Sequence, residues 1–262
     1  DIDYVGRSDP FNLMDIYYPK GTIERLPAII SIHGGGYVYG DKDVYKLYCG
    51  FLAELGFTVV NFNYHLAPRT KFPVQLTEIN SVMRWVAANG KDHHIDTDRI
   101  FLVGDSAGAQ MCSQYAAIFT NPSYEKLFSF DVPHELHVRA IALNCGVYTI
   151  ESAAGNKLFN TKGLIHDYFG KDLNIYGKMI DMLGAITPDY PPTYIMTSYY
   201  DFFKANAEPM YEHLRSKGIE CVCKCYGTKE QKYMGHVCHI NLNLEEAKQI
   251  NRDEAEFFKR KI

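Results

Sequence analysis

The five residues Gly104-Asp105-Ser106-Ala107-Gly108 constrain the fold of this chain more than any other segment. An apolar run at residues 99–103 precedes them, and small and apolar residues suited to a buried helix follow over residues 106–119. A chain that passes so abruptly from strand to helix must turn sharply at Ser106, and the neighbours two positions away on either side must be small. The pattern therefore predicts a strand–turn–helix unit, a nucleophile elbow, that presents the Ser106 hydroxyl.

A glycine-rich loop with an incidental serine would also fit these five residues. Two features of the surroundings favour the elbow. The motif stands directly between a strand and a helix, as the elbow requires. A helix that begins at Ser106 also directs its first amides and the positive end of its dipole toward developing negative charge.

Strand-like and helix-like segments alternate along the chain, which indicates an α/β fold with a mostly parallel central sheet flanked by helices. Strands are expected at residues 13–18, 28–32, 57–62, 99–103, 137–143, 193–197 and 219–226. Helices are expected at residues 44–55, 76–88, 106–119, 205–217 and 243–261. Residues 148–190 interrupt the alternation, so we expect a helical insertion late in a single domain that spans residues 1–262.

A second motif, His33-Gly34-Gly35-Gly36, follows the strand expected at residues 28–32. Glycines have no Cβ, so their backbone N–H groups can approach a substrate oxygen closely. Fixed amide donors stabilise the oxyanion of a tetrahedral intermediate by about 3 kcal/mol each. A flexible turn is the alternative, but it does not explain why this motif precedes a nucleophile elbow.

Together these motifs resemble the hormone-sensitive-lipase-like branch of the α/β-hydrolase carboxylesterases. The segment Asn63-Tyr64-His65-Leu66-Ala67-Pro68, followed by Phe72-Pro73, is similar to that family's Tyr-Arg-Leu-Ala-Pro…Phe-Pro segment. His65 stands where the family usually has Arg. The family usually carries an N-terminal helical cap, whereas about ten residues precede the first expected strand here. The insertion at residues 148–190 is therefore expected to roof the site as a partial cap.

The resemblance implies an α/β-hydrolase fold and an oxyanion hole made by backbone amides. The donors would come from the amide of Ala107 and from the glycine loop, with Gly35 and Gly36 preferred and Gly34 left open. His33 would shape that loop, and Asp105 would support it.

A serine needs a base and an acid, and in this fold the chain order is Ser, then Asp or Glu, then His. Asp201 follows the strand expected at residues 193–197, although an Asp there could also be a helix N-terminal charge. Asp189 precedes that strand and is a poor rival. His236 lies in Gly235-His236-Val237, which resembles the family's Gly-His-x-Phe segment. His239 stays open as the base; otherwise it is expected at a helix N-terminus or the surface.

Four tyrosines near the motifs, Tyr37, Tyr39, Tyr199 and Tyr200, are expected to line the mouth of the pocket, with simple packing as the alternative. Such a mouth would suit a small acyl group on a sugar or an aromatic alcohol. A long-chain lipid is less favoured, because no extended apolar lid is evident.

Composition excludes other classes of function. A net charge of −4 gives no basic surplus for nucleic acid. No stretch is apolar enough to span a membrane. The first residues lack the pattern of a signal peptide, and removal of one before residue 1 is left open. Seven cysteines, an odd number, favour a reducing, cytoplasmic setting over a disulfide framework. The chemistry requires neither metal nor cofactor, and a homodimer is left open.

The sequence therefore predicts a serine carboxylesterase that hydrolyses short-chain, acetyl-type esters through an acyl-enzyme, with Ser106, Asp201 and His236 as catalytic residues. A non-catalytic ligand-binding protein on a hydrolase scaffold is one alternative, but such proteins typically lack a member of the triad. A lipase or serine peptidase of the same fold is another, and such peptidases usually carry a large extra domain.

Overall fold

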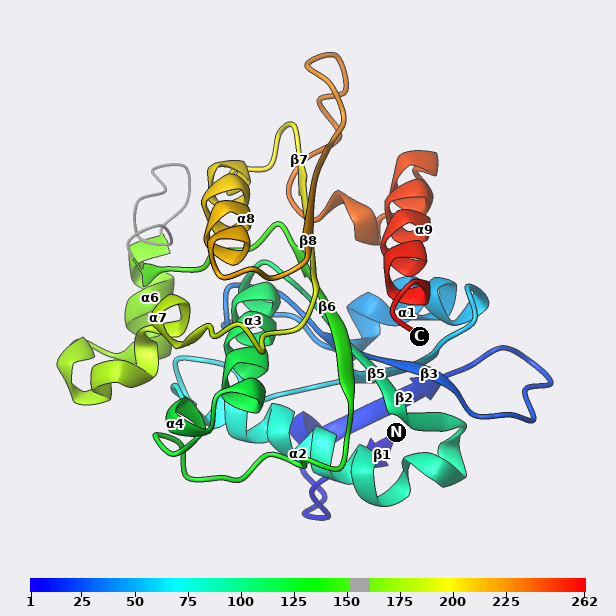
Figure 1. Ribbon diagram of the computed structural model, residues 1–262, viewed down its shortest axis with the longest axis horizontal. Coiled ribbons are helices and arrows are strands. Elements are labelled where there is room, and N and C mark those ends of the chain that lie inside the picture. Colours follow the sequence, from blue (N-terminus) through cyan, green and yellow to red (C-terminus); the bar gives the residue numbers. More distant parts are fainter. Residues whose placement is uncertain (151–160) are drawn as a thin grey trace.

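An eight-stranded sheet with helices on both faces forms the centre of the computed structural model, which describes residues 1–150 and 161–262 (Figure 1). The strand order is β1-β2-β4-β3-β5-β6-β7-β8. The strands are β1 Ile2–Asp3, β2 Leu13–Tyr17, β3 Leu26–Ile32, β4 Thr58–Phe62, β5 Ile95–Asp105, β6 Val138–Asn144, β7 Thr193–Ser198 and β8 Cys221–Tyr226. Strands β3 to β8 are mutually parallel. Strand β2 pairs antiparallel with β4 on one side and with β1 on the other. The mostly parallel sheet expected from the sequence is confirmed.

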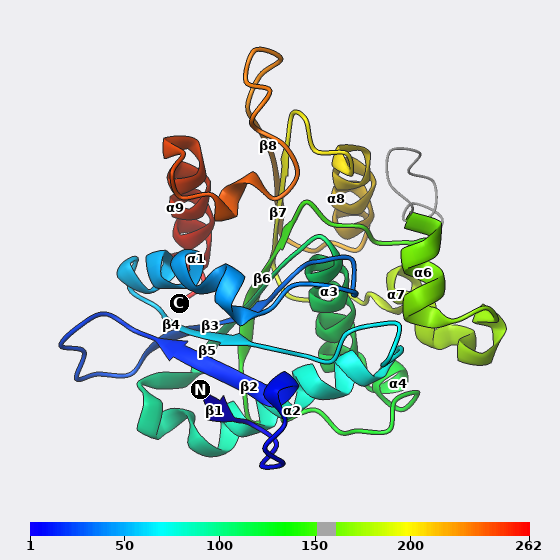
Figure 2. The same cartoon turned by 180° about the vertical axis from the view of Figure 1, so that it is seen from behind.

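Helices cover both faces of this sheet (Figures 1 and 2). The α-helices are α1 Lys42–Glu54, α2 Val74–Asn89, α3 Ala107–Thr120, α4 Pro122–Glu125, α6 Thr161–Phe169, α7 Met182–Ala185, α8 Ala207–Ser216 and α9 Glu245–Lys259. Short 3-10 helices span Pro10–Asn12, Gly90–His93, Leu173–Ile180, Lys204–Asn206 and Cys238–Ile240. Helices α1 and α9 share one face, and α2, α3 and α8 lie on the other.

Each face of the sheet has its own apolar core. Phe57, Phe101 and Phe258 belong to the cluster under α1 and α9, while Ile79 and Met111 belong to the cluster under α2 and α3. Because both faces are covered, β4 is buried along its whole length. Such strands appear in a sequence as continuous apolar runs, which is why the central strands were predictable.

Part of the expected insertion at residues 148–190 is visible as α6, the 3-10 helix Leu173–Ile180 and α7. These elements lie beyond α3, on its side away from the sheet, and α7 packs against α3 (Figures 1 and 2). Residues 151–160 of the insertion lie outside the described residues. Among the described helices, none has the length and apolarity needed to cross a membrane.

The bounds of several strands differ by one or two residues from those expected, and those of β5 differ most. Strand β5 begins at Ile95, four residues before the expected start at residue 99. Its first residues pair with Leu26 and Pro27, and the register then shifts before Ala28 pairs with Ile100. Polar residues at this shift hide the beginning of the strand from a search for apolar runs.

Candidate active site

The turn from β5 into α3 has the geometry of a nucleophile elbow. Ser106 adopts φ 54° and ψ −117°, a conformation that a non-glycine residue rarely takes, and α3 begins at the next residue. A Cβ at Gly104 would collide with the backbone of Gly108, and a Cβ at Gly108 would collide with the carbonyl oxygens of Ile32 and His33. Glycine is therefore required at both positions by backbone contacts across the turn.

Three side chains from separate parts of the chain meet at the carboxyl edge of the parallel strands. Ser106 follows β5, Asp201 follows β7, and His236 lies between β8 and α9. The Nε2 of His236 lies 2.9 Å from the Oγ of Ser106, and its Nδ1 lies 2.6 Å from the Oδ1 of Asp201. The structure thus brings together the three residues predicted from the sequence, with His236 hydrogen-bonded to Asp201 on one side and to Ser106 on the other.

The Asp201 carboxylate is buried and receives several donors. The Thr197 hydroxyl donates to its Oδ2 at 2.7 Å, and the Phe203 N–H donates to its Oδ1 at 3.0 Å. Burial opposes ionisation, but the hydrogen bond and charge of His236 and these donors outweigh it, so the pKa of Asp201 lies below its ordinary value. An ionised Asp201 can fix the orientation of the His236 ring.

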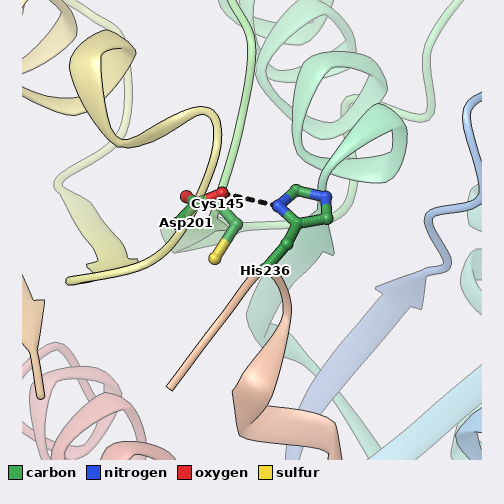
Figure 3. Close-up of side chains that lie close together, drawn as sticks. All are labelled: Cys145, Asp201 and His236. Atoms are coloured by element: carbon green, nitrogen blue, oxygen red, sulfur yellow. Dashed lines mark hydrogen bonds and ion pairs between the residues drawn. The ribbon is translucent and has the colours of Figure 1, made fainter. Parts of the chain in front are cut away.

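A buried thiol, Cys145, stands beside the Asp–His pair (Figure 3). Cys145, Asp201 and His236 each offer one possible metal-ligand atom within 4.8 Å of the others. A zinc-type site would need the thiolate, yet burial and the Asp201 charge raise the pKa of Cys145 well above its ordinary value. Both ring nitrogens of His236 are also engaged, by Asp201 and Ser106. The chemistry of the cluster therefore fits a hydrogen-bonded dyad better than a metal site.

The glycine loop lies directly against the elbow. Gly36 and Ala107 border the same cavity as Ser106. The N–H of Gly34 instead donates to the Tyr45 hydroxyl at 3.0 Å, away from the cavity. Gly35 has φ 108°, and a Cβ there would collide with the carbonyl of Tyr39. Gly36, Ala107 and Gly35 thus remain as candidate oxyanion donors, whereas the N–H of Gly34 is already committed.

His33 is buried inside the loop. Its Nδ1 lies 2.7 Å from the Gly34 carbonyl oxygen, and its ring stacks on Tyr64 with centroids 4.0 Å apart. Burial lowers the pKa of His33 to about 4, so the ring is neutral at pH 7 and its Nδ1 donates to that carbonyl. The Tyr64 hydroxyl donates to the His33 carbonyl at 2.8 Å. His33 is therefore placed to hold the shape of the loop.

A cavity of about 310 Å³ opens over Ser106. It is lined by Gly36, Tyr37, Tyr39, Ser106, Ala107, Val147, Thr161, Leu164, Ile165, Phe202, Phe203 and His236. The wall is mainly apolar, and the few polar groups converge at Ser106 and His236, as in small-molecule sites. Three of the lining residues belong to α6, so the described part of the insertion forms a wall of the cavity.

The four tyrosines expected at the mouth separate into two pairs. Tyr37 and Tyr39 line the cavity. Tyr199 and Tyr200 do not, and that expectation is wrong for them. The Tyr200 hydroxyl donates to the carbonyl of Lys229 at 2.6 Å, and the Tyr199 ring lies under the Lys204 ammonium. A β-bridge between Tyr200 and Gly235 also anchors the bend after β7 on the loop that carries His236.

Two phenylalanines occupy the place expected for that second pair. The Phe202 ring lies 4.0 Å from the His236 ring, centroid to centroid, and the Phe203 ring lies 5.5 Å away. Both border the cavity. Sequence reasoning missed them, although their position directly after Asp201 was an available signal.

His239, the other candidate base, lies in the short 3-10 helix Cys238–Ile240, as one of its two expected places allowed, but it is buried and not at the surface. It packs edge-on against Tyr48 with ring centroids 5.2 Å apart. Burial and the neighbouring His236 lower the pKa of His239 to about 3. No described hydrogen-bond partner reaches either ring nitrogen. His239 is thus a neutral side chain of the core at pH 7, on the α1 side of the sheet.

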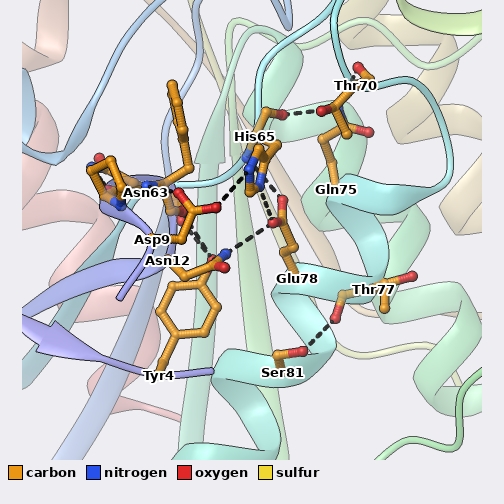
Figure 4. Close-up of polar contacts among 12 residues, drawn as sticks. Tyr4, Asp9, Asn12, Asn63, His65, Thr70, Gln75, Thr77, Glu78 and Ser81 are labelled. Carbon is orange, nitrogen blue, oxygen red and sulfur yellow. Dashed lines mark hydrogen bonds and ion pairs between the residues drawn. The ribbon is translucent and has the colours of Figure 1, made fainter. Parts of the chain in front are cut away.

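His65, which replaces the usual Arg, is held between two carboxylates (Figure 4). Its Nδ1 lies 2.5 Å from the Oε1 of Glu78, and its Nε2 lies 3.2 Å from the Oδ2 of Asp9. Its backbone N–H also donates to Glu78 at 2.8 Å. Two residues on, the N–H of Ala67 donates to the carbonyl of Tyr37 at 2.9 Å. The segment that follows His65 thus holds the backbone of Tyr37, whose side chain is part of the cavity wall.

Residues 29–239 match the model of a protein family described as having the alpha/beta hydrolase fold. A versiconal hemiacetal acetate esterase of Dothistroma septosporum is 39% identical over 102 residues, which are 38% of this chain and 31% of that protein. A putative alpha/beta hydrolase of Acanthamoeba polyphaga mimivirus is 25% identical over 78% of this chain and 60% of its own length. An acetyl esterase of Salmonella schwarzengrund is 23% identical over 93% of this chain and 74% of its own. The chain thus spans less than two thirds of the first two relatives.

Solved structures support the fold independently. Esterase B from Lactobacillus rhamnosis superposes with a TM-score of 0.89 at 24% identity, over 99% of this chain and 84% of that one. An esterase from Pyrobaculum calidifontis superposes with a TM-score of 0.76 at 24% identity, over 94% of this chain and 80% of that one. At this level of identity, the likeness shows a shared fold.

Proposed function

The chain belongs to the α/β-hydrolase family, and from that premise we propose that it is a serine carboxylesterase for short-chain, acetyl-type esters. One observation carries the proposal. The hydrogen-bonded line from Asp201 through His236 to Ser106 ends at a mainly apolar cavity, beside a loop of backbone amides. This is the arrangement that acyl transfer needs: a base on the nucleophile, an acid on the base, and donors for an oxyanion.

In the first half-reaction, the Oγ of Ser106 attacks the ester carbonyl carbon while the Nε2 of His236 takes the hydroxyl proton. Asp201 stabilises the imidazolium that forms. The carbonyl oxygen becomes an oxyanion, and the amides of Gly36, Ala107 and Gly35 are the candidate donors. The tetrahedral intermediate collapses, His236 returns the proton to the leaving alkoxide, and an acyl-Ser106 ester remains.

In the second half-reaction, water takes the place of the alcohol. His236 removes a proton from the water, and the resulting hydroxide attacks the acyl carbon. Collapse of the second intermediate returns the proton to Ser106 and releases the carboxylic acid. These steps require neither a metal nor an organic cofactor.

The preference for short chains rests on the size of the cavity and on the relatives. A cavity of about 310 Å³ lies at the small end of the range for ligand sites, about 300–1,000 Å³. Two of the relatives carry acetate-ester names, namely acetyl esterase and versiconal hemiacetal acetate esterase. A short acyl group with a modest alcohol would fill such a space.

The test compares hydrolysis of p-nitrophenyl acetate, butyrate, octanoate and palmitate by the wild type and by Ser106→Ala, His236→Ala and Asp201→Asn. We expect the wild type to favour acetate or butyrate and the first two variants to lose about 10⁴- to 10⁶-fold in kcat. Asp201→Asn should lose about 10⁴-fold, because an amide selects the wrong tautomer of His236.

Asp189→Asn is the matched control, because Asp189 is an exposed carboxylate outside the site and should retain wild-type kcat. A fluorophosphonate probe should label Ser106 in the wild type and not in Ser106→Ala. A wild type that cleaves no ester and takes up no probe would refute the proposal and favour the ligand-binding alternative. Preferential cleavage of palmitate would refute the short-chain assignment alone.

A further inference from the structure

A buried tyrosine links the glycine loop to the nucleophile elbow. Tyr45 lies in the first turns of α1, and its side chain is buried. Its hydroxyl accepts the N–H of Gly34 at 3.0 Å and donates to the Oδ2 of Asp105 at 2.9 Å. Gly34 precedes Gly35 and Gly36, of which Gly36 borders the cavity, and Asp105 precedes Ser106 in the chain. One hydroxyl thus joins the two segments that must be aligned for catalysis.

The loop and the elbow are already in close contact at this point. A Cβ at Gly34 would lie 2.8 Å from the carbonyl oxygen of Asp105 and 3.2 Å from the Cβ of Ser106. Such a contact permits approach but does not select a register, because van der Waals contact has little directionality. The hydrogen bonds of Tyr45 are directional, so they can select one position of the loop relative to Ser106.

The Tyr45 hydroxyl is the side-chain donor to the Asp105 carboxylate and also an acceptor for the amide of Gly34. Burial raises the pKa of Asp105 to about 6, while the hydrogen bond from Tyr45, the charge of His236 and the amide of Gly34 oppose that rise. Gly34 and Asp105 are both buried, so loss of the hydroxyl would leave the carboxylate without its side-chain donor and the amide without its hydroxyl acceptor. The glycine loop and the elbow could then shift relative to each other to find other hydrogen-bond partners for these groups.

We propose that Tyr45 is a positioning residue that fixes the oxyanion loop against the nucleophile elbow through the Gly34–Tyr45–Asp105 hydrogen bonds. This inference rests on the proposed esterase function. Tyr45 is not among the described residues that line the cavity, so it acts through the loop and touches no substrate. Its hydroxyl also commits the N–H of Gly34, which leaves the oxyanion to the amides that follow it and to Ala107.

The test uses Tyr45→Phe, which removes the hydroxyl and keeps the ring. Tyr48→Phe is the matched control: Tyr48 lies one turn later on α1, is equally buried, and donates its hydroxyl to Glu254 at 3.2 Å and not to the loop. We expect Tyr45→Phe to lower kcat by about 10- to 100-fold with KM within about twofold, because only the oxyanion contacts of the transition state are lost. Tyr48→Phe should retain kcat within about threefold, because the Tyr48 hydroxyl bonds to Glu254 and makes no hydrogen bond to the glycine loop or to Asp105.

A second measurement does not depend on turnover. Amide hydrogen exchange at Gly34, followed by NMR, should be at least about tenfold faster in Tyr45→Phe than in the wild type and unchanged in Tyr48→Phe. Equal losses of kcat in both variants would assign Tyr45 a merely structural role and overturn the proposal. Unchanged exchange at Gly34 would overturn it as well. If the wild type hydrolyses no ester, the esterase function fails, and the exchange rates still decide whether Tyr45 fixes the loop.

Discussion

At the scale of single residues, two tyrosines of one loop border the same cavity with opposite burial. Tyr37 is 4% exposed, stacks on Tyr168 with ring centroids 3.8 Å apart, and donates its hydroxyl to Gln110 at 3.3 Å. Tyr39 is 67% exposed at the mouth of the cavity. The first side chain belongs to the core as much as to the site, while the second contributes to the site alone.

Alanine should therefore act differently at these two positions. Tyr37→Ala should lower the free energy of unfolding by about 3–5 kcal/mol, as expected for truncation of a packed aromatic ring. Tyr39→Ala should leave stability within about 0.5 kcal/mol and raise KM for aryl esters by about two- to tenfold. Urea unfolding and steady-state kinetics on the same preparations measure both quantities. The control is Tyr200→Ala, which lies outside the cavity. If Tyr39→Ala leaves every KM at its wild-type value, the mouth is formed by other residues.

The sequence predicted side chains well where one backbone motif dictates their position. Ser106 could be placed because G-x-S-x-G forces a strained turn, and His236 because it follows the last strand in the required chain order. Tyr199 and Tyr200 were misplaced, because the direction of a side chain after β7 depends on the bend and on the loop that anchors it. The burial of His239 was equally invisible, since it arises from α1, which is distant in sequence.

At the scale of elements, α6 both lines the cavity and is tied to the segment before α2. Ile165 and Leu164 face the cavity, and a Cβ at Gly36 would lie 2.8 Å from a methyl of Leu164. The N–H of Phe72 donates to the carbonyl of Tyr168 at 3.0 Å, which ties α6 to the segment before α2. The sequence predicted an insertion here but not which side of α6 faces the cavity, because a short amphipathic segment can pack against several neighbours.

We expect Ile165→Ala to enlarge the cavity and to change ester preference. Removal of a few methyl and methylene groups from an apolar pocket changes discrimination by about 1–3 kcal/mol. The ratio of kcat/KM for octanoate to that for acetate should rise about tenfold or more, or the same change should appear between methyl and benzyl butyrates, depending on which half of the ester faces α6. Lys162→Ala, exposed on the same helix, is the control. Unaltered ratios in both series would exclude α6 as a selective wall.

At the scale of the whole molecule, the core contains ionisable groups whose effects on stability oppose one another. Burial lowers the pKa of His239 to about 3, and it raises the pKa of Glu254 to about 7 despite hydrogen bonds from Asn144 at 2.7 Å and Tyr48 at 3.2 Å. The stability linked to His239 is complete above its unfolded pKa of 6.5 and is lost as the pH falls toward 3. The stability linked to Glu254 is complete below its unfolded pKa of 4.5 and is lost as the pH rises through about 7.

Between pH 7 and 5 the changes in the free energy of unfolding linked to the two groups should therefore nearly cancel. A variant that removes one group should reveal the contribution of the other. Relative to the wild type, the free energy of unfolding of Glu254→Gln should fall by roughly 2–3 kcal/mol over this range, because the variant does not gain from protonation. That of His239→Leu should rise by about 2 kcal/mol between pH 6.5 and 5. Urea unfolding of the wild type, both variants and the double variant at pH 5, 6, 7 and 8 measures these slopes. The double variant should recover a profile close to that of the wild type. A Glu254→Gln curve parallel to the wild type would mean that Glu254 ionises normally within the fold, and the hydrogen bonds from Asn144 and Tyr48 would then be strong enough to offset its burial.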